Sequence, residues 1–100
     1  MSSSEIDAVR ALLLEKPRPV GWQERRRRLD EVAAVWPIAN DVKLLSVDID
    51  GVHGEWSIVA GSDLNRVLLY FHGGGYCAGS AVSHRRMVTE AGRAGGVRTL

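Results

Sequence analysis

The sequence is poor in cysteine and in net charge, and it lacks a long apolar run. Its one cysteine, Cys77, excludes an internal disulfide and a metal site built from several thiolates. Thirteen basic residues stand against twelve acidic ones, a formal net charge of +1, so the composition gives no reason to expect nucleic acid or a charged membrane surface as a partner. No apolar run approaches the ~20 residues of a membrane span, and the N-terminus lacks the basic-then-apolar pattern of a signal peptide. We therefore expect a cytoplasmic protein without a membrane span.

The one local excess of charge is a run of four arginines, residues 25–28. Neighbouring residues of a helix point about 100° apart, so the run does not form one stripe. We interpret it as a solvated helix surface rather than a polyanion-binding site.

The first 40 residues predict two helices. Residues 4–15 and 21–36 both repeat apolar residues at helical spacing, and prolines follow each segment. Trp22 and Trp36 fall on the apolar stripe of the second helix, which favours core or interdomain packing over ligand stacking.

From residue 41 the apolar pattern changes to the period of two that indicates strands. Residues 43–50 and 52–60 alternate around Asp50-Gly51, a strong signal for a type I′ hairpin. We expect one side of the hairpin to face water, with His53, Glu55 and Ser57 on that side. His53 therefore receives no catalytic role.

A strand–loop–helix–strand unit follows. Residues 61–65 predict a turn, and the unbroken apolar run 67–71 predicts a strand covered on both faces, as in a parallel sheet. Residues 83–94 predict a helix that Gly95-Gly96 ends, and residues 97–100 begin the next parallel strand. The pattern is that of an α/β protein seen at its beginning, and we expect the polypeptide to continue past Leu100.

The predicted buried strand runs into His72 and three consecutive glycines, Gly73 to Gly75. Open α/β sheets place ligand sites in such loops, and consecutive glycines let peptide N–H groups point at an anion. Phosphate is the weaker interpretation, because no lysine follows the glycines and the third glycine of the dinucleotide pattern is replaced by Ala78. The stronger interpretation is an oxyanion hole, whose fixed N–H donors stabilise the charge on an ester carbonyl under attack.

The stretch RVLLYFHGGGYCAGSAVSHRR, residues 66–86, resembles the hormone-sensitive-lipase-like family of α/β-hydrolases. The likeness lies in His72 to Gly75, in the following Tyr76, in Gly79-Ser80 and in Ser83-His84-Arg85, and the helices and hairpin extend it to nearly the whole chain. The resemblance implies an α/β-hydrolase fold in which residues 1–40 form an N-terminal helical cap segment and residues 41–100 begin the core. It implies a carboxylic ester hydrolase, an esterase or lipase that acts on small-molecule esters by serine acyl transfer, with no cofactor or metal.

The same resemblance assigns roles within the loop. The backbone N–H groups of Gly74 and Gly75 would donate to the oxyanion, Gly73 would allow the turn, and His72 would anchor the loop by hydrogen bonds. Tyr76 would lie near the acyl pocket.

The family's nucleophile is a serine in Gly-Asp-Ser-Ala-Gly, and no such motif occurs in these residues. By the family's pattern the chain supplies the cap helices and the oxyanion loop but not the triad, so we expect the 100 residues alone to be inactive. The alternative is a non-catalytic, receptor-like member of the same fold that binds a small acidic ligand. A homodimer is left open.

Residues 75–79 also match a nucleophile elbow with Cys77 in the serine position and His84 as a nominal base. An elbow nucleophile sits directly at a strand-to-helix turn, whereas Cys77 comes six residues after Phe71 and beyond the glycines. We therefore favour a small packed thiol over a catalytic one.

Overall fold

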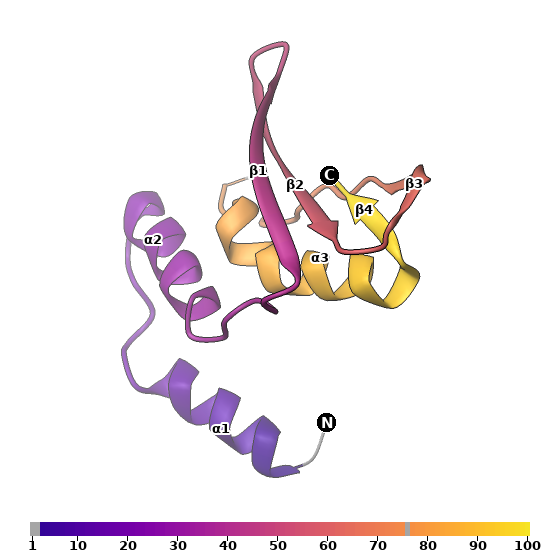
Figure 1. The fold of residues 1–100 in the computed structure, drawn as a ribbon. Helices are drawn as coiled ribbons and strands as arrows, with labels where there is room; N and C mark the ends of the chain where they lie inside the picture. Colours follow the sequence, from indigo (N-terminus) through magenta and orange to yellow (C-terminus); the bar gives the residue numbers. More distant parts are fainter. Residues whose placement is uncertain (1–2, 76) are drawn as a thin grey trace.

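The computed structural model describes residues 3–75 and 77–100 of the chain. Its elements, in chain order, are α1 (Ser3–Leu14), α2 (Trp22–Ala33), β1 (Val42–Ile49), β2 (Val52–Val59), β3 (Asp63–Leu68), α3 (Ala81–Gly95) and β4 (Val97–Thr99). The four strands form one sheet in the order β1-β2-β4-β3; α3 packs against it, and α1 and α2 stand to one side (Figure 1). The predicted α/β class is confirmed.

The hairpin forms as the sequence predicts, with β1 and β2 paired antiparallel along their whole length. Asp50 (φ 52°) and Gly51 (φ 88°) both have positive φ, as a type I′ turn requires. The Gly51 N–H donates to the Asp48 carboxylate at 2.7 Å, so the residue before the turn also stabilises it.

The strand that leads to the glycines begins earlier than predicted. β3 starts at Asp63, inside the expected turn, and an irregularity in the pairing between Asp63 and Val67 absorbs the extra residues. Its pairing with β4 is parallel, as predicted, and continues beyond the strand through the Tyr70 N–H, which donates to the Leu100 carbonyl at 2.8 Å. The expected burial of this strand on both faces is wrong for this chain: β3 is exposed throughout, because α3 packs against β2 and β4 rather than against β3.

α3 begins two residues before the predicted start, because Ser80 caps it. The Ser80 hydroxyl accepts the Ser83 N–H at 3.1 Å, and the Ser83 hydroxyl accepts the Ser80 N–H at 2.8 Å, a reciprocal capping box. At the other end Gly96 adopts the left-handed conformation (φ 63°, ψ 34°) that stops a helix, as predicted.

α3 covers the face of β2 that the alternation assigns to water, so that expectation is wrong. Ser57 is 3% exposed and the Glu55 side chain 12%, whereas His53 remains exposed. Glu55 can lie there because Arg85 of α3 binds its carboxylate with two hydrogen bonds of 2.9 and 2.7 Å. The small Ser57 side chain also lets the helix come close.

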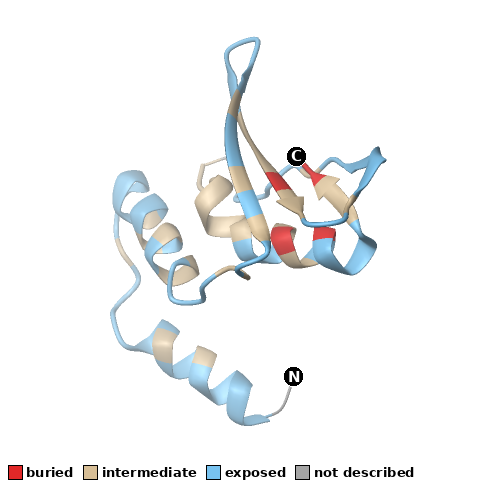
Figure 2. Cartoon of the chain, viewed as in Figure 1, coloured by how far each residue is buried: buried red, intermediate tan, exposed pale blue. Residues whose placement is uncertain are grey.

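A glycine provides the same close approach between α3 and β4. A Cβ on Gly92 would lie 2.9 Å from the Thr99 Cγ2 atom and 3.1 Å from the Val97 carbonyl oxygen. Figure 2 shows the buried positions, in red, where α3 meets β2 and β4. The tightest packing of the chain is therefore between this helix and the centre of the sheet.

The two N-terminal helices are joined through Arg28. Its guanidinium donates to the carbonyls of Leu13, Lys16 and Pro17 at 2.9, 3.2 and 3.1 Å. These carbonyls lie at and beyond the end of α1, where backbone acceptors have no helical partner, so the arginine joins the end of α1 to α2.

The four arginines of α2 bind four different sets of partners, so they form no single basic surface. Arg25 donates to the Pro19 carbonyl, Arg26 to the Cys77 carbonyl, Arg27 to Glu24 and Arg28 to the end of α1.

α2 ends at Ala33, three residues before the predicted end. Pro37 disfavours the helical conformation in the residue before it, which is Trp36. Trp22 is 56% exposed and Trp36 37%, so neither tryptophan packs into a core formed by the described residues, and packing against another domain stays a prediction.

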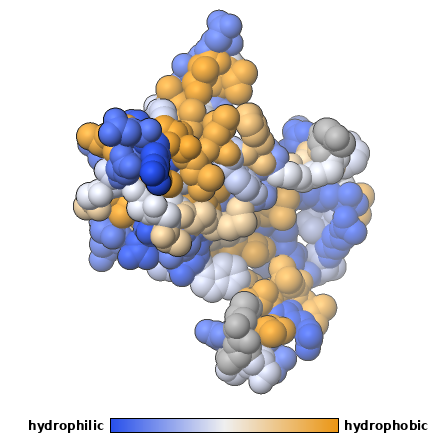
Figure 3. Space-filling model, turned by 90° about the vertical axis from the view of Figure 1, so that its right-hand side faces the viewer, coloured by the Kyte–Doolittle hydropathy of each residue, from blue (hydrophilic) through white to orange (hydrophobic). Residues whose placement is uncertain are grey.

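Across residues 3–75 and 77–100, no hydrophobic side chain is fully buried. Figure 3 views the molecule from the side of β3 and β4 and shows broad hydrophobic areas, in orange. Leu64 (70% exposed) and Phe71 (81%) belong to β3 and the segment after it. Of the helices described, none is long and apolar enough to cross a membrane.

Candidate active site

The loop between β3 and α3 depends on three glycines with positive φ: Gly74 (φ 150°), Gly75 (φ 64°) and Gly79 (φ 99°). Residues with a side chain rarely adopt these conformations. Gly73 is different: its φ is not positive, and a Cβ there would meet nothing within 4 Å. The structural demand for glycine thus falls on Gly74, Gly75 and Gly79 rather than on Gly73, to which the resemblance assigns the turn.

Two of these glycines also lie against backbone. A Cβ on Gly74 would be 1.7 Å from the Ala78 carbonyl oxygen, and a Cβ on Gly79 would be 2.4 Å from the Gly73 carbonyl oxygen. The loop therefore folds back on itself so closely that no side chain fits at either position.

The Gly74 carbonyl holds this turn together. It accepts the Cys77 N–H at 3.2 Å, the Ala78 N–H at 3.1 Å and the Cys77 thiol at 3.4 Å. In the described residues we find no hydrogen bond from the Gly74 or Gly75 N–H to another group of the protein. Among these residues the Gly74 carbonyl is thus used within the turn, whereas the two N–H groups have no acceptor.

The loop borders an open cavity of about 590 Å³. Gly73, Gly74 and Gly75 line it together with the 77–79 segment, His72 and Arg26, which reaches it from α2. The positive charge of Arg26 beside backbone N–H groups that have no acceptor among the described residues suits an anionic or oxyanionic group. Among the described residues, no group of three or more His, Cys, Asp or Glu side chains is placed to hold a metal ion.

His72 contacts the loop and α3. Its Nδ1–H donates to the Gly73 carbonyl at 3.1 Å, and its ring stacks on His84 with centroids 5.5 Å apart and planes 26° apart. The stacking holds the start of the loop against α3, while the hydrogen bond lies within the loop itself.

Solved structures of known proteins are similar to this chain in fold. No family model matches the sequence, and no curated protein matches it at the significance we required. Three solved structures are similar over nearly the whole chain. An esterase from the bacterial hormone-sensitive lipase family is 32% identical over 99% of the chain, with a TM-score of 0.87. An esterase/lipase from an uncultured bacterium is 32% identical over 98% (TM-score 0.81), and the esterase EstE5 with PMSF is 33% identical over 99% (TM-score 0.82).

The chain folds as the N-terminal portion of a hormone-sensitive-lipase-like α/β-hydrolase. It spans about a third of each of these structures: 34% of the first two and 35% of EstE5. The family and the fold that the sequence resembles are therefore confirmed. The resemblance places Tyr76 near the acyl pocket, but Tyr76 lies outside the described residues.

Cys77 has none of the surroundings of an elbow nucleophile in this hydrolase portion. It lies between the end of β3 at Leu68 and the start of α3 at Ala81, and its thiol donates to the Gly74 carbonyl. The His84 Nδ1 contacts the Ser83 hydroxyl at 2.9 Å, and no contact between His84 and Cys77 occurs among the described residues. The half-buried thiol belongs to the turn, which agrees with the preference for a packed cysteine.

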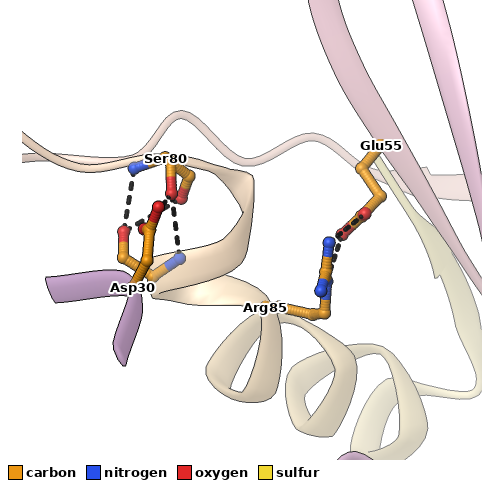
Figure 4. Close-up of polar contacts among 5 residues, drawn as sticks. Asp30, Glu55, Ser80 and Arg85 are labelled. Atoms are coloured by element: carbon orange, nitrogen blue, oxygen red, sulfur yellow. Dashed lines mark hydrogen bonds and ion pairs between the residues drawn. The ribbon is translucent and has the colours of Figure 1, made fainter. Parts of the chain in front are cut away.

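Sequence reasoning missed two contacts that hold the elements around the loop (Figure 4). Arg85 of α3 binds Glu55 of the hairpin, and this hydrogen bonding raises the pKa of the Arg85 guanidinium above its usual value. Asp30 of α2 accepts the Ser80 hydroxyl at 2.5 Å. The partners are 30 and 50 residues apart in the sequence, and no local pattern marks them.

Proposed function

We propose that the chain supplies the N-terminal helices and the oxyanion-hole loop of a carboxylic ester hydrolase that works by serine acyl transfer. Residues 1–40 serve as its cap segment and residues 41–100 as the start of its core. The nucleophile, acid and base come from outside these 100 residues.

The observation that carries this proposal is the pair of unused donors, the N–H groups of Gly74 and Gly75, beside an open cavity. Backbone donors fixed before the reaction stabilise a charge that develops at a carbonyl oxygen, and one such donor contributes ~10²–10³-fold in kcat. The positive φ values of both glycines support the role, because they hold the peptide planes in conformations that other residues would resist.

In this reaction the general base takes the proton of a serine hydroxyl while the serine oxygen attacks the ester carbonyl, and the carbonyl oxygen becomes the anion that the two N–H groups bind. Collapse of this intermediate breaks the ester C–O bond, passes that proton from the base, now the general acid, to the leaving alcohol, and leaves an acyl-enzyme. Water then gives a proton to the base and attacks the acyl-enzyme through a second oxyanion at the same donors, and collapse returns the proton to the serine and releases the carboxylic acid. The two glycines would thus act twice in each turnover.

The solved structures support the same reaction class, since the similar proteins are named as esterases. One EstE5 crystal was soaked in p-nitrophenyl butyrate, which makes that ester a reasonable first substrate. We propose small-molecule esters of short to medium acyl chain as the substrate class, and a cytoplasmic location.

The test measures turnover of p-nitrophenyl butyrate by the polypeptide that carries residues 1–100, with the release of p-nitrophenolate as the signal. We expect saturable hydrolysis, with the heat-denatured protein as control. Absence of turnover combined with saturable binding of a small carboxylate would contradict the hydrolase and favour the receptor-like alternative.

A further inference from the structure

Helix α2 holds the segment that follows the glycines at two points. The Arg26 Nε–H donates to the Cys77 carbonyl at 2.6 Å, and Asp30 accepts the Ser80 hydroxyl at 2.5 Å (Figure 4 shows the second contact). Arg26 and Asp30 are four residues apart and therefore lie on the same face of α2. One face of an N-terminal helix thus holds both ends of residues 77–80.

The Arg26 contact leads to a proposed oxyanion donor through two rigid peptide planes. The Cys77 carbonyl and the Ala78 N–H belong to one peptide unit, and this N–H donates to the Gly74 carbonyl at 3.1 Å. The Gly74 carbonyl and the Gly75 N–H belong to a second unit. In a trans peptide the C=O and N–H groups point in opposite directions, so the Gly75 N–H points away from the bonded Gly74 carbonyl.

We propose that Arg26 is a positioning residue for the oxyanion hole, an inference that rests on the proposed function. By holding the Cys77–Ala78 peptide, Arg26 sets the orientation of the Gly74–Gly75 peptide and with it the direction of the Gly75 N–H. Hydrogen bonds in such a series also polarise one another, which strengthens the last donor. The N-terminal helix therefore acts on the reaction itself and not only on access to the cavity.

Three substitutions separate the hydrogen bond from the charge, since Arg26 also brings a positive charge to the cavity. In Arg26→Gln the amide nitrogen takes the place of Nε, so the donor is kept and the charge is lost. In Arg26→Lys a methylene occupies that place and the ammonium lies one bond further out, so the charge is kept and the donor at the Nε position is lost; Arg26→Met loses both. Arg27→Met is the matched control, because Arg27 is the adjacent arginine and pairs with Glu24 of its own helix.

The experiment measures kcat and KM for p-nitrophenyl butyrate, with a thermal melt of each variant, in the polypeptide that carries residues 1–100. We expect Arg26→Met and Arg26→Lys to lower kcat about 10- to 100-fold, because displacement of a reacting geometry by ~1 Å costs this much. We expect KM to stay within about 2-fold, because the oxyanion exists only in the transition state. Arg26→Gln should stay near the wild type, as should Arg27→Met.

Two results would overturn the proposal. The first is a kcat of Arg26→Met equal to that of Arg27→Met. The second is an equal loss of kcat in Arg26→Gln and Arg26→Met, which would assign the effect to charge. If Arg26→Met does not fold, the comparison of Arg26→Lys with Arg26→Gln decides. If the wild type hydrolyses no ester, the proposed function fails, and the positioning link is tested by the ¹⁵N–¹H resonance of Gly75. That resonance should move in Arg26→Met but not in Arg26→Gln or Arg27→Met; an unmoved resonance refutes the link.

Discussion

Replacing Gly74 by alanine tests the oxyanion loop most directly. The new Cβ would lie 1.7 Å from the Ala78 carbonyl oxygen, whereas real contacts of this kind are hardly ever shorter than 3.0 Å. The two groups must therefore separate by about 1.3 Å, which disrupts the turn that the Gly74 carbonyl closes. Because both proposed donors belong to this turn, we expect kcat to fall by about 10²-fold or more, with KM nearly unchanged.

Gly75→Ala is the internal comparison. Gly75 also has positive φ, but its Cβ would lie 3.9 Å from the Cys77 sulfur, an ordinary contact. We expect a stability loss of about 1–2 kcal/mol from the left-handed conformation and a smaller loss of kcat than in Gly74→Ala. The assay is steady-state hydrolysis of p-nitrophenyl butyrate, with near-UV circular dichroism to show that each variant is folded. A folded Gly74→Ala protein with kcat within about 3-fold of the wild type would refute the reasoning.

Two further predictions concern stability. In the polypeptide that carries residues 1–100, Glu55→Ala removes the partner of a half-buried Arg85 and should lower the free energy of unfolding by urea by about 1–2 kcal/mol. Glu24→Ala breaks an exposed pair within α2 and should cause no measurable change. Equal effects of the two substitutions would show that the Glu55–Arg85 contact is not structural. The isolated 100-residue chain should be inactive on p-nitrophenyl butyrate and melt without a cooperative transition, because the described residues bury no hydrophobic side chain; a sharp calorimetric transition would contradict this.

The elements that the sequence predicts well are those in which the reason is local. Asp50-Gly51 specifies its turn because two adjacent residues must adopt positive φ, and Gly96 ends α3 for the same reason. The glycine triplet belongs to this class in part, since Gly74 and Gly75 need the conformations that glycine permits. Gly79 needs them too, but it stands outside the triplet, and a side chain there would collide with the Gly73 carbonyl.

The predictions that are wrong depend on contacts between distant segments. Alternation along β2 separates its two faces correctly, but it does not tell which face a helix covers. Polar Glu55 and Ser57 indicate water until Arg85, thirty residues later, neutralises the carboxylate. Burial of β3 is a similar case: an unbroken apolar run predicts a covered strand, but the run does not tell which element covers it, and in this chain α3 packs against β2 and β4 instead.

The position of the glycine loop explains why an N-terminal helix should matter to it. The loop follows β3, an exposed edge strand whose one partner, β4, is three residues long, so the sheet alone holds the loop weakly. Its other end is held by α3 through the Ser80 cap and by α2 through Arg26 and Asp30. A donor that must be fixed to within about 0.5 Å needs such support from elements outside its own strand. If the proposed roles hold, α2 of the cap segment and the oxyanion loop work as one structure, and a change in the position of α2 reaches the reacting carbonyl through the peptide planes between them.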